Sequence, residues 1–355
     1  MAAFSPIDKA TLFQNNVLYT GNGTAIGSGG QAITGVGFSA DFTWLKERSS
    51  TSGHHWFDTP RGATEKISSD SQAAESANSE TLASWQSDGF TVGNAGGANE
   101  SGQTYVAWNW KAGTTSGLSG GTITPSAYSI NTTSKFGICK YTGNGSAGAT
   151  IAHGLGATPY MIIVKRLTNT YDWAVQTPYT HATDSQEYIL RINTTDGSTQ
   201  DDAFNNTLAT STVVTLGAST YTNATSADQE YVMYAWAPVN GFSDIGKYSG
   251  IGDSNGPMVY TGFKPSFVLI KRSNSSGGNW WIWDNKRLGY NPDNDNLYAD
   301  ITNAEDQSGR LIDIFSNGFK LRSADNGVNG SGNTYNYMAF GQSLVASNGI
   351  ITTAK

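Results

Sequence analysis

The chain has 355 residues, including 42 glycines, and only 14% of its residues are charged. A net charge of −7 with scattered Lys and Arg residues excludes the clustered basic face that nucleic-acid binding requires. The sequence has neither the apolar stretch of a membrane-spanning helix nor the basic and apolar regions of a secretory signal, so we expect no membrane insertion and synthesis without a signal peptide.

The first predicted elements are short strands separated by Gly/Asn/Ser turns. The turn in "LYTGNG" (18–23) is followed by "GVGFSADFTWLKER" (35–48), whose near-continuous apolar run is typical of a strand buried in a sandwich. A Trp-centred strand, "HHWFD" (54–58), and an almost uncharged aromatic strand, "TYVAWNWKAG" (104–113), complete this block.

The rest of the chain repeats the block twice. The opening turn returns as "KYTGNG" (140–145) and "KYSGIG" (247–252), and the aromatic strand returns as "EYVMYAWAPV" (230–239) and "TYNYMAFGQS" (334–343). Each copy carries two Tyr residues at nearly the same separation, and a Trp or Phe follows the second Tyr: Tyr19, Tyr105 and Trp110; Tyr141, Tyr231 and Trp236; Tyr248, Tyr335 and Phe340. Such self-similarity indicates a repeated supersecondary unit.

These repeats predict an all-β fold of three tandem antiparallel β-sandwich modules with jelly-roll or lectin-like cores. A β-propeller is the competing repeat fold, but its blades of about 40–50 residues are half as long as these copies. Weak helix signals in 73–85 and 305–315 predict a turn or two of helix at most. The predicted boundaries are an N-terminal segment (1–17), a first module (18–113), a Gly/Ser/Thr-rich linker (114–134), a second module (135–243), a third module (244–347) and a C-terminal tail (348–355). The short join at 237–246 predicts that modules two and three pack together. The longer linker either gives module one a more variable angle or crosses a neighbouring module.

Residues suited to catalysis are few. His54 and His55 lie beside Asp58, but the other copies carry different residues there, which favours a structural role. Asp58 and Asp284 recur beside the Trp strand; a glycoside hydrolase needs two carboxylates about 5–9.5 Å apart, and these two are equally suited to capping turns. The single cysteine, Cys139, excludes an intrachain disulfide. The sequence predicts a protein that is not an enzyme and has no cofactor.

A polar loop offers the one candidate for a metal. In "NPDNDN" (291–296), Asp293 and Asp295 supply oxygen atoms of the kind that calcium prefers. The full ligand spacing of a calcium loop is missing, so we predict a polar loop without metal.

Several tryptophans are candidates for a surface or an interface. Period-2 geometry places Trp281 and Trp283 on one face of a strand and Trp280 on the other, so one set lies outside the core of its own module. Outward tryptophans indicate a subunit interface or a surface on which sugars stack. The candidates are Trp56, Trp173, Trp280, Trp281 and Trp283.

With these motifs in view, the chain resembles a repeat-containing family of tail-fibre-like virion surface proteins from bacteriophages of marine bacteria and cyanobacteria. The resemblance is closest over 35–113, and the second and third copies resemble the family's continuation. One departure is Asn109, where a Cys is common in the family. The matching segments are "GFSADFTWLKERS", "HHWFDTPRGA", "SSDSQAAES", "SWQSDGFTVG" and "NESGQTYVAWNWKAG".

The resemblance implies a non-enzymatic structural protein on the exterior of a phage particle. Modules that begin by residue 18 leave little room for a tail-anchoring domain, so a capsid or tail decoration protein is expected alongside a fibre. We expect contacts with other virion proteins, a homotrimer, and adhesion to the host surface, where glycans are candidate ligands, or stabilisation of the particle.

Two alternatives remain open. One is a free lectin-like protein that binds carbohydrate through exposed tryptophans. The other is a glycan hydrolase, which rests only on the scattered carboxylates.

Overall fold

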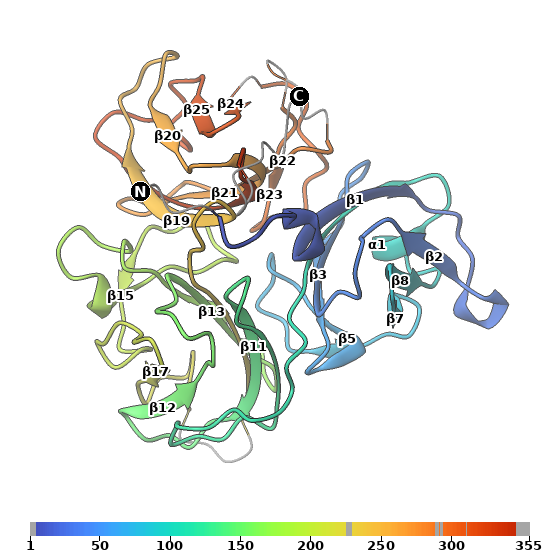
Figure 1. The fold of residues 1–355 in the computed structure, drawn as a ribbon, viewed down its shortest axis with the longest axis horizontal. Coiled ribbons are helices and arrows are strands. Elements are labelled where there is room, and N and C mark those ends of the chain that lie inside the picture. The colour runs from blue at the N-terminus through green and yellow to red at the C-terminus, as the bar shows by residue number, and fades with distance from the viewer. Residues whose placement is uncertain (1–4, 225–228, 288–290, 292–293, 310, 346–355) are drawn as a thin grey trace.

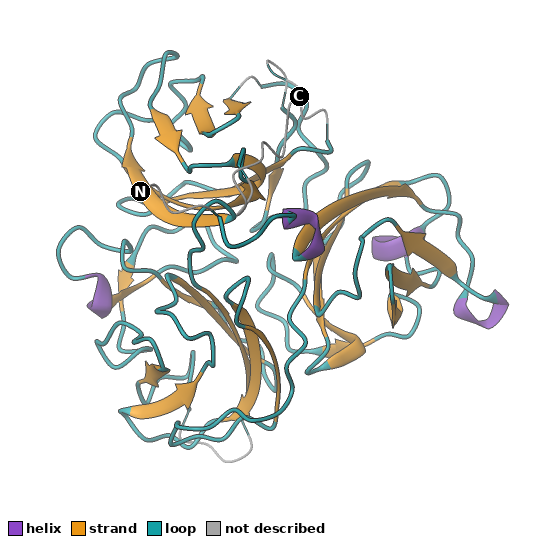
Figure 2. Ribbon diagram, in the orientation of Figure 1, coloured by secondary structure: helices purple, strands orange, loops and turns teal. Residues whose placement is uncertain are grey.

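A computed structural model describes residues 5–224, 229–287, 291, 294–309 and 311–345. The fold class is confirmed: the described residues form antiparallel sheets joined by turns (Figure 2). The described helices are a single α turn, α1 (Gly96–Asn99), and three 3₁₀ turns, η1 (Ala10–Leu12), η2 (Ile26–Ser28) and η3 (Ser185–Glu187). None of these described helices is long and apolar enough to cross a membrane.

Three large sheets share one strand order. The strand that leads into the repeated turn, which we call the opening strand, pairs with the aromatic strand. The aromatic strand also pairs with the strand formed by the apolar run (the apolar strand), which in turn pairs with the Trp-centred strand. The first sheet has the order β1 (Gln14–Thr20), β9 (Thr104–Trp110), β3 (Phe42–Glu47), β4 (His54–Asp58), β5 (Gly62–Ile67) and β6 (Ser76–Ala77). The second has the order β10 (Ala127–Asn131), β11 (Phe136–Thr142), β18 (Glu230–Trp236), β13 (Met161–Arg166) and β14 (Ala174–Gln176). The third has the order β19 (Ser243–Ser249), β26 (Thr334–Gln342), β21 (Lys264–Arg272), β22 (Trp280–Asp284) and β23 (Leu297–Tyr298).

Smaller sheets cover one face of each large sheet. They are β2 (Gln31–Thr34), β8 (Gly89–Val92) and β7 (Leu82–Gln86) in the first; β12 (Ala149–Ala152) with β17 (Val213–Leu216) and β15 (Tyr188–Ile189) with β16 (Thr199–Gln200) in the second; and β20 (Met258–Tyr260), β25 (Gly318–Leu321) and β24 (Ile312–Phe315) in the third. Apolar side chains of each large sheet and its smaller sheet form a separate core. We call each such sandwich a unit, numbered in chain order.

The opposite faces of the three large sheets pack against one another. Figure 1 shows the first (blue), second (green) and third (orange to red) units around a common centre. There, Phe42, Trp236 and Phe340 belong to one buried cluster that all three units share. We call this cluster the central core. The first unit is therefore packed against its neighbours, and the predicted variable angle is wrong.

The aromatic strands supply both kinds of core because a separation of five residues puts two side chains on opposite faces of a strand. In β9, Tyr105 lies in the core of the first unit, whereas Trp110 lies in the central core. The same division separates Tyr231 from Trp236 in β18 and Tyr335 from Phe340 in β26. A charged residue on either face would be desolvated, which explains why these strands carry almost no charge.

The repeated tyrosines form one stacked pair in each unit. The ring centroids are 5.0 Å apart for Tyr19–Tyr105, 5.3 Å for Tyr141–Tyr231 and 5.1 Å for Tyr248–Tyr335. In the third unit, the Tyr335 hydroxyl donates to the Asn326 carbonyl (2.7 Å) and accepts the Gly330 N–H (2.7 Å). The pair thus fixes the loop that precedes the aromatic strand.

A buried asparagine holds the repeated turn. The side-chain oxygen of Asn99 accepts the Asn22 N–H at 2.8 Å, and Asn223 and Asn329 hold the corresponding turns at 2.6 and 3.0 Å. The last glycine of each turn has a left-handed backbone, with φ values of 70°, 69° and 70° at Gly23, Gly145 and Gly252. Glycine adopts this conformation without the cost that a Cβ imposes, which explains why it recurs there.

Three predicted segments differ from the structure. Strand β10 lies inside the predicted linker 114–134, and Ile123 of the same segment donates its N–H to the Thr150 carbonyl (2.9 Å) at the edge of β12. The Gly/Ser/Thr-rich composition of 114–134 is typical of a linker, so it did not predict this edge strand. The helix signals in 73–85 and 305–315 are also wrong, because these segments include strands β7 and β24 and pairing with neighbouring strands overrides weak propensity.

The first unit also begins earlier than predicted. Strand β1 starts at Gln14, inside the segment expected to precede the module. Gln14 and Asn16 are buried, and the Gln14 amide donates to Asn16 Oδ1 at 2.6 Å. Because polar residues fill the buried positions, the start of this strand shows no apolar alternation.

Candidate functional site

The structure buries all five candidate tryptophans. Their exposed fractions are 0% for Trp56, 0% for Trp173, 1% for Trp280, 8% for Trp281 and 0% for Trp283. The proposed surface location is therefore wrong, since none of them is available to a sugar or to a second chain. Apolar strands that are buried on both faces by their own chain explain the surplus of aromatics.

The expected division within one strand is nonetheless present. Trp281 and Trp283 stack in the core of the third unit, with ring centroids 5.6 Å apart. Trp280 points the other way into the central core, where its Nε1–H donates to the Arg191 carbonyl of the second unit (2.9 Å). Trp280, with Trp56 and Trp173, thus lies at an interface between units of a single chain.

His54 lies in the buried contact between the first and third units. Burial lowers the pKa of His54 well below its usual value. Its Nδ1 accepts the Trp44 Nε1–H at 2.8 Å, which requires an unprotonated nitrogen. Burial likewise lowers the pKa of His55 to about 3, so both side chains are neutral packing groups.

The recurring carboxylates belong to buried ion pairs. Asp58 pairs with Arg61 at 2.5 Å and accepts the hydroxyl of Tyr234 from the second unit at 2.6 Å. Asp284 pairs with Arg287 at 2.7 Å and accepts the Nε1–H of Trp108 from the first unit at 2.8 Å. Each carboxylate therefore ties its own unit to a neighbour.

One lysine in each apolar strand serves the same purpose. Burial lowers the pKa of Lys46, Lys165 and Lys271 from 10.5 to about 8. Each ammonium donates to a backbone carbonyl of a neighbouring unit: Thr302 for Lys46 (3.3 Å), Gln72 for Lys165 (3.0 Å) and Thr194 for Lys271 (3.2 Å). The first unit donates to the third, the second to the first and the third to the second, so the contacts form a closed ring.

The candidate calcium loop is only partly described. Asp293 lies outside the described residues. Burial, with the nearby Glu305 carboxyl, raises the pKa of Asp295 to about 6. Within the described ranges, no group of three or more His, Cys, Asp or Glu side chains is arranged to hold a metal ion.

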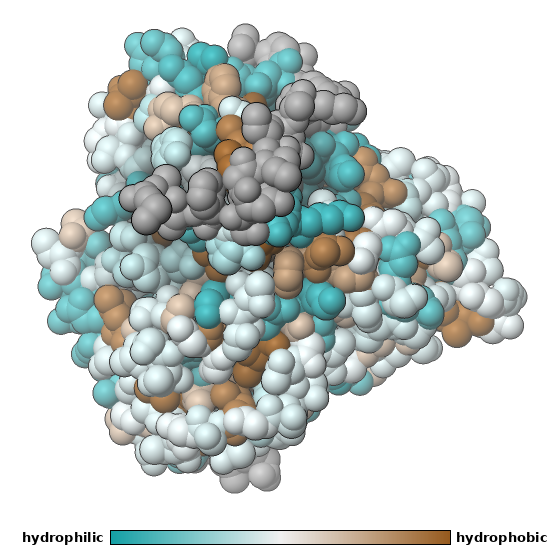
Figure 3. Space-filling model, viewed as in Figure 1, coloured by the Kyte–Doolittle hydropathy of each residue, from teal (hydrophilic) through white to brown (hydrophobic). Residues whose placement is uncertain are grey.

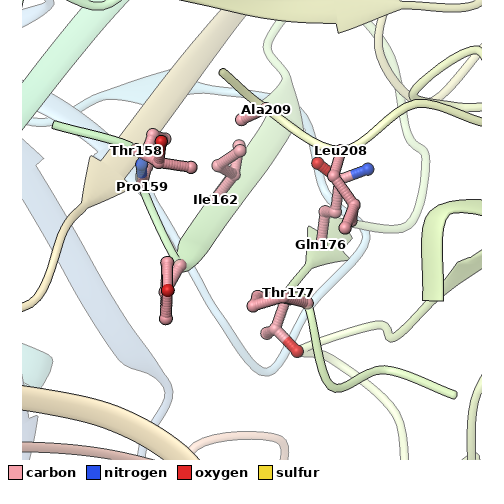
Figure 4. Close-up of a pocket in the computed structure, with 9 residues that line it drawn as sticks. Thr158, Pro159, Ile162, Gln176, Thr177, Leu208 and Ala209 are labelled. Atoms are coloured by element: carbon pink, nitrogen blue, oxygen red, sulfur yellow. The ribbon is translucent and has the colours of Figure 1, made fainter. Parts of the chain in front are cut away.

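One pocket lies inside the second unit. Figure 4 shows Pro159, Ile162 and Leu208 around this cavity of about 210 Å³. The volume falls below the roughly 300–1,000 Å³ of sites that hold small ligands.

A larger pocket lies between the second and third units. It has a volume of about 450 Å³, which is within the range of ligand sites. The lining residues include an aromatic pair, a lysine and several hydroxyl and amide side chains: Thr180, His181, Ala182, Tyr188, Ser198, Lys247, Tyr248, Ser249, Ser273, Asn274 and Thr334. We call it the junction pocket. The repeats do not predict this pocket, because its walls combine segments of two different units that lie far apart in the sequence.

The molecule is thus an all-β protein in which three related sandwiches surround one core. Residues 9–343 match a single family described as "Domain of unknown function (DUF7483)", and the chain belongs to this family. The match extends across all three units. No curated protein and no solved structure matches the chain.

Proposed function

We propose that this chain is a non-enzymatic structural protein on the exterior of a bacteriophage particle. It acts there as a fibre-like or decoration protein that contributes to host-surface adhesion or to stabilisation of the particle. The motifs in 35–113 that resemble tail-fibre-like virion proteins support this proposal, as does the threefold repetition within the chain.

The observation that carries the proposal is the use made of the chain's ionisable groups. Asp58, Asp284 and Lys271 are buried between units, where they hold the three sandwiches together. Backbone pairs reinforce the ring: Ser52 N–H donates to Thr302, Tyr171 N–H to Gln72 and Gly277 N–H to Thr195. These ionisable side chains therefore stabilise the contacts between units, which is the role expected of them in a structural component of a particle.

The surface is consistent with a component exposed to solvent. On the face shown in Figure 3, hydrophobic residues lie in small groups among hydrophilic ones. We propose other virion proteins as partners and retain the homotrimer as part of the proposal. Because the central core is filled by one chain, a trimer would have to assemble through the outer surfaces of the units.

The proposal is tested by locating the chain on purified particles. We expect mass spectrometry to detect it as a stoichiometric component, and a density map to show the three-unit shape on the tail or over the capsid. Particles that lack the chain would contradict the proposal.

A free lectin-like protein is the second candidate, and the junction pocket favours it. Saturable sugar binding by a chain that is absent from particles would support this alternative.

A further inference from the structure

Hydrogen bonds connect several residues that line the junction pocket. At the contact between the second and third units, the Ser198 N–H donates to the Ser273 carbonyl at 2.7 Å. On the third unit's side, Asn274 Oδ1 accepts the Thr334 N–H at 3.0 Å. The walls are therefore fixed by bonds within and between the two units, so little order has to be gained when a ligand binds.

The pocket carries a positive charge in an acidic protein. Lys247 is exposed at its wall, and no carboxylate is among the described residues that line it. His181 also lines the pocket, but its Nδ1 accepts the Asp184 N–H at 3.3 Å and therefore offers no proton to a ligand. Lys247 is therefore the charge that a ligand meets.

Comparison with the second unit shows why this charge is available. At the corresponding position, Lys140 forms an ion pair with Glu230 across the strands at 3.2 Å. Thr334 stands in the third unit where the second unit has Glu230. The described contact of Lys247 is instead with the ring of Tyr179, whose centroid lies 5.8 Å from the ammonium. A cation–π contact holds the ammonium in place without cancelling its charge.

An aromatic pair also lines the pocket. The rings of His181 and Tyr188 stack in parallel, with centroids 4.0 Å apart and an angle of 5° between their planes. The C–H face of a pyranose ring packs on aromatic side chains, while its hydroxyls need polar partners around the edge. Ser249, Asn274 and Thr334 provide side chains of that kind.

We propose that the junction pocket binds a pyranose that carries a carboxylate, as in the uronate units of an acidic polysaccharide. The sugar ring lies against the His181–Tyr188 stack, and its carboxylate accepts hydrogen bonds from the Lys247 ammonium. This inference deepens the adhesion part of the proposed function, but it rests on the pocket's own chemistry.

Titration calorimetry of the full chain with tri-galacturonate tests the proposal, with maltotriose as the neutral probe. We expect saturable binding of the uronate trimer and much weaker binding of maltotriose. A charged hydrogen bond is worth about 1.5–3 kcal/mol, so Lys247→Gln should weaken uronate binding roughly 10- to 100-fold. Lys140→Gln, at the corresponding site of the second unit, should leave binding unchanged.

A further variant separates the two halves of the pocket. Tyr188→Leu should weaken binding by removing the aromatic face, and matching melting curves for all variants would show that they are folded. Absence of saturable uronate binding, equal binding of maltotriose, or unchanged affinity of Lys247→Gln would overturn the proposal. Because location on particles is measured separately, the failure of this proposal and the failure of the proposed function are distinguishable.

Discussion

At the residue scale, three buried lysines make stability depend on pH. Burial lowers the pKa of Lys46, Lys165 and Lys271 to about 8 in the folded chain, whereas an unfolded lysine titrates near about 10.4. Between these values, the unfolded state binds more protons than the folded state. The free energy of unfolding therefore rises with pH in this window, and the gain is lost as the pH falls through about 8.

We accordingly expect the urea midpoint to be higher at about pH 9.5 than at about pH 7.5, measured by tryptophan fluorescence. The comparison stays below the range where the tyrosines, whose pKa values burial raises, act in the opposite direction. Lys271→Met should show a shallower rise than the parent, because one of the three titrating groups is gone. A midpoint that falls over this interval would contradict the lowered pKa values of these three lysines.

The buried ion pairs lead to a second prediction at this scale. Asp284→Asn leaves the fully buried Arg287 without its closest partner, and breaking a buried pair in this way costs about 3–5 kcal/mol. In the second unit, Thr177 and Thr180 occupy the corresponding positions and bond to each other. The double change Asp284→Thr with Arg287→Thr should therefore cost less than the single change.

Equilibrium unfolding in urea provides the comparison, and the unaltered chain is the reference. If the double variant were less stable than Asp284→Asn, the intact ion pair would contribute stability of its own, beyond preventing an unpaired buried charge.

At the scale of the element, the aromatic strand shows how far the sequence specified the fold. Its repetition correctly indicated an all-β, antiparallel structure, and the alternation in β22 correctly separated Trp280 from Trp281 and Trp283. The sequence could not predict what packs against Trp280, because a strand pattern shows that a face is apolar but not which surface covers it. Here the cover is another unit of the same chain.

Other elements escaped prediction because their signals are weak. Strand β10 has the composition of a linker, and the buried start of β1 is polar. The junction pocket combines Tyr188 and Lys247, which lie in different units, so no local motif marks it.

The repeated tyrosines give a prediction at this scale. Tyr335→Phe removes a hydroxyl that both donates to Asn326 and accepts from Gly330, leaving the buried Gly330 N–H unpaired at a cost of about 1–3 kcal/mol. Tyr260→Phe is the matched control, because Tyr260 is 70% exposed, and it should leave stability unchanged. Chemical denaturation measures both, and equal effects would contradict the proposed role of the stacked pair.

At the scale of the whole molecule, the central core couples the three units to one another. In a tandem array, each sandwich has its own core and stability is distributed along the chain. Here Trp110, Trp236 and Phe340 come from three units and pack in one cluster, so separating any unit exposes apolar surface on all three. We infer that the chain folds as a single cooperative body.

Differential scanning calorimetry of the full chain tests this claim most directly. Coupling through the central core predicts one transition whose calorimetric enthalpy equals its van't Hoff enthalpy. The same single transition should move to lower temperature in Trp236→Ala. Two or three resolved transitions, with only one of them shifted by that substitution, would show that the units fold independently and would contradict the account.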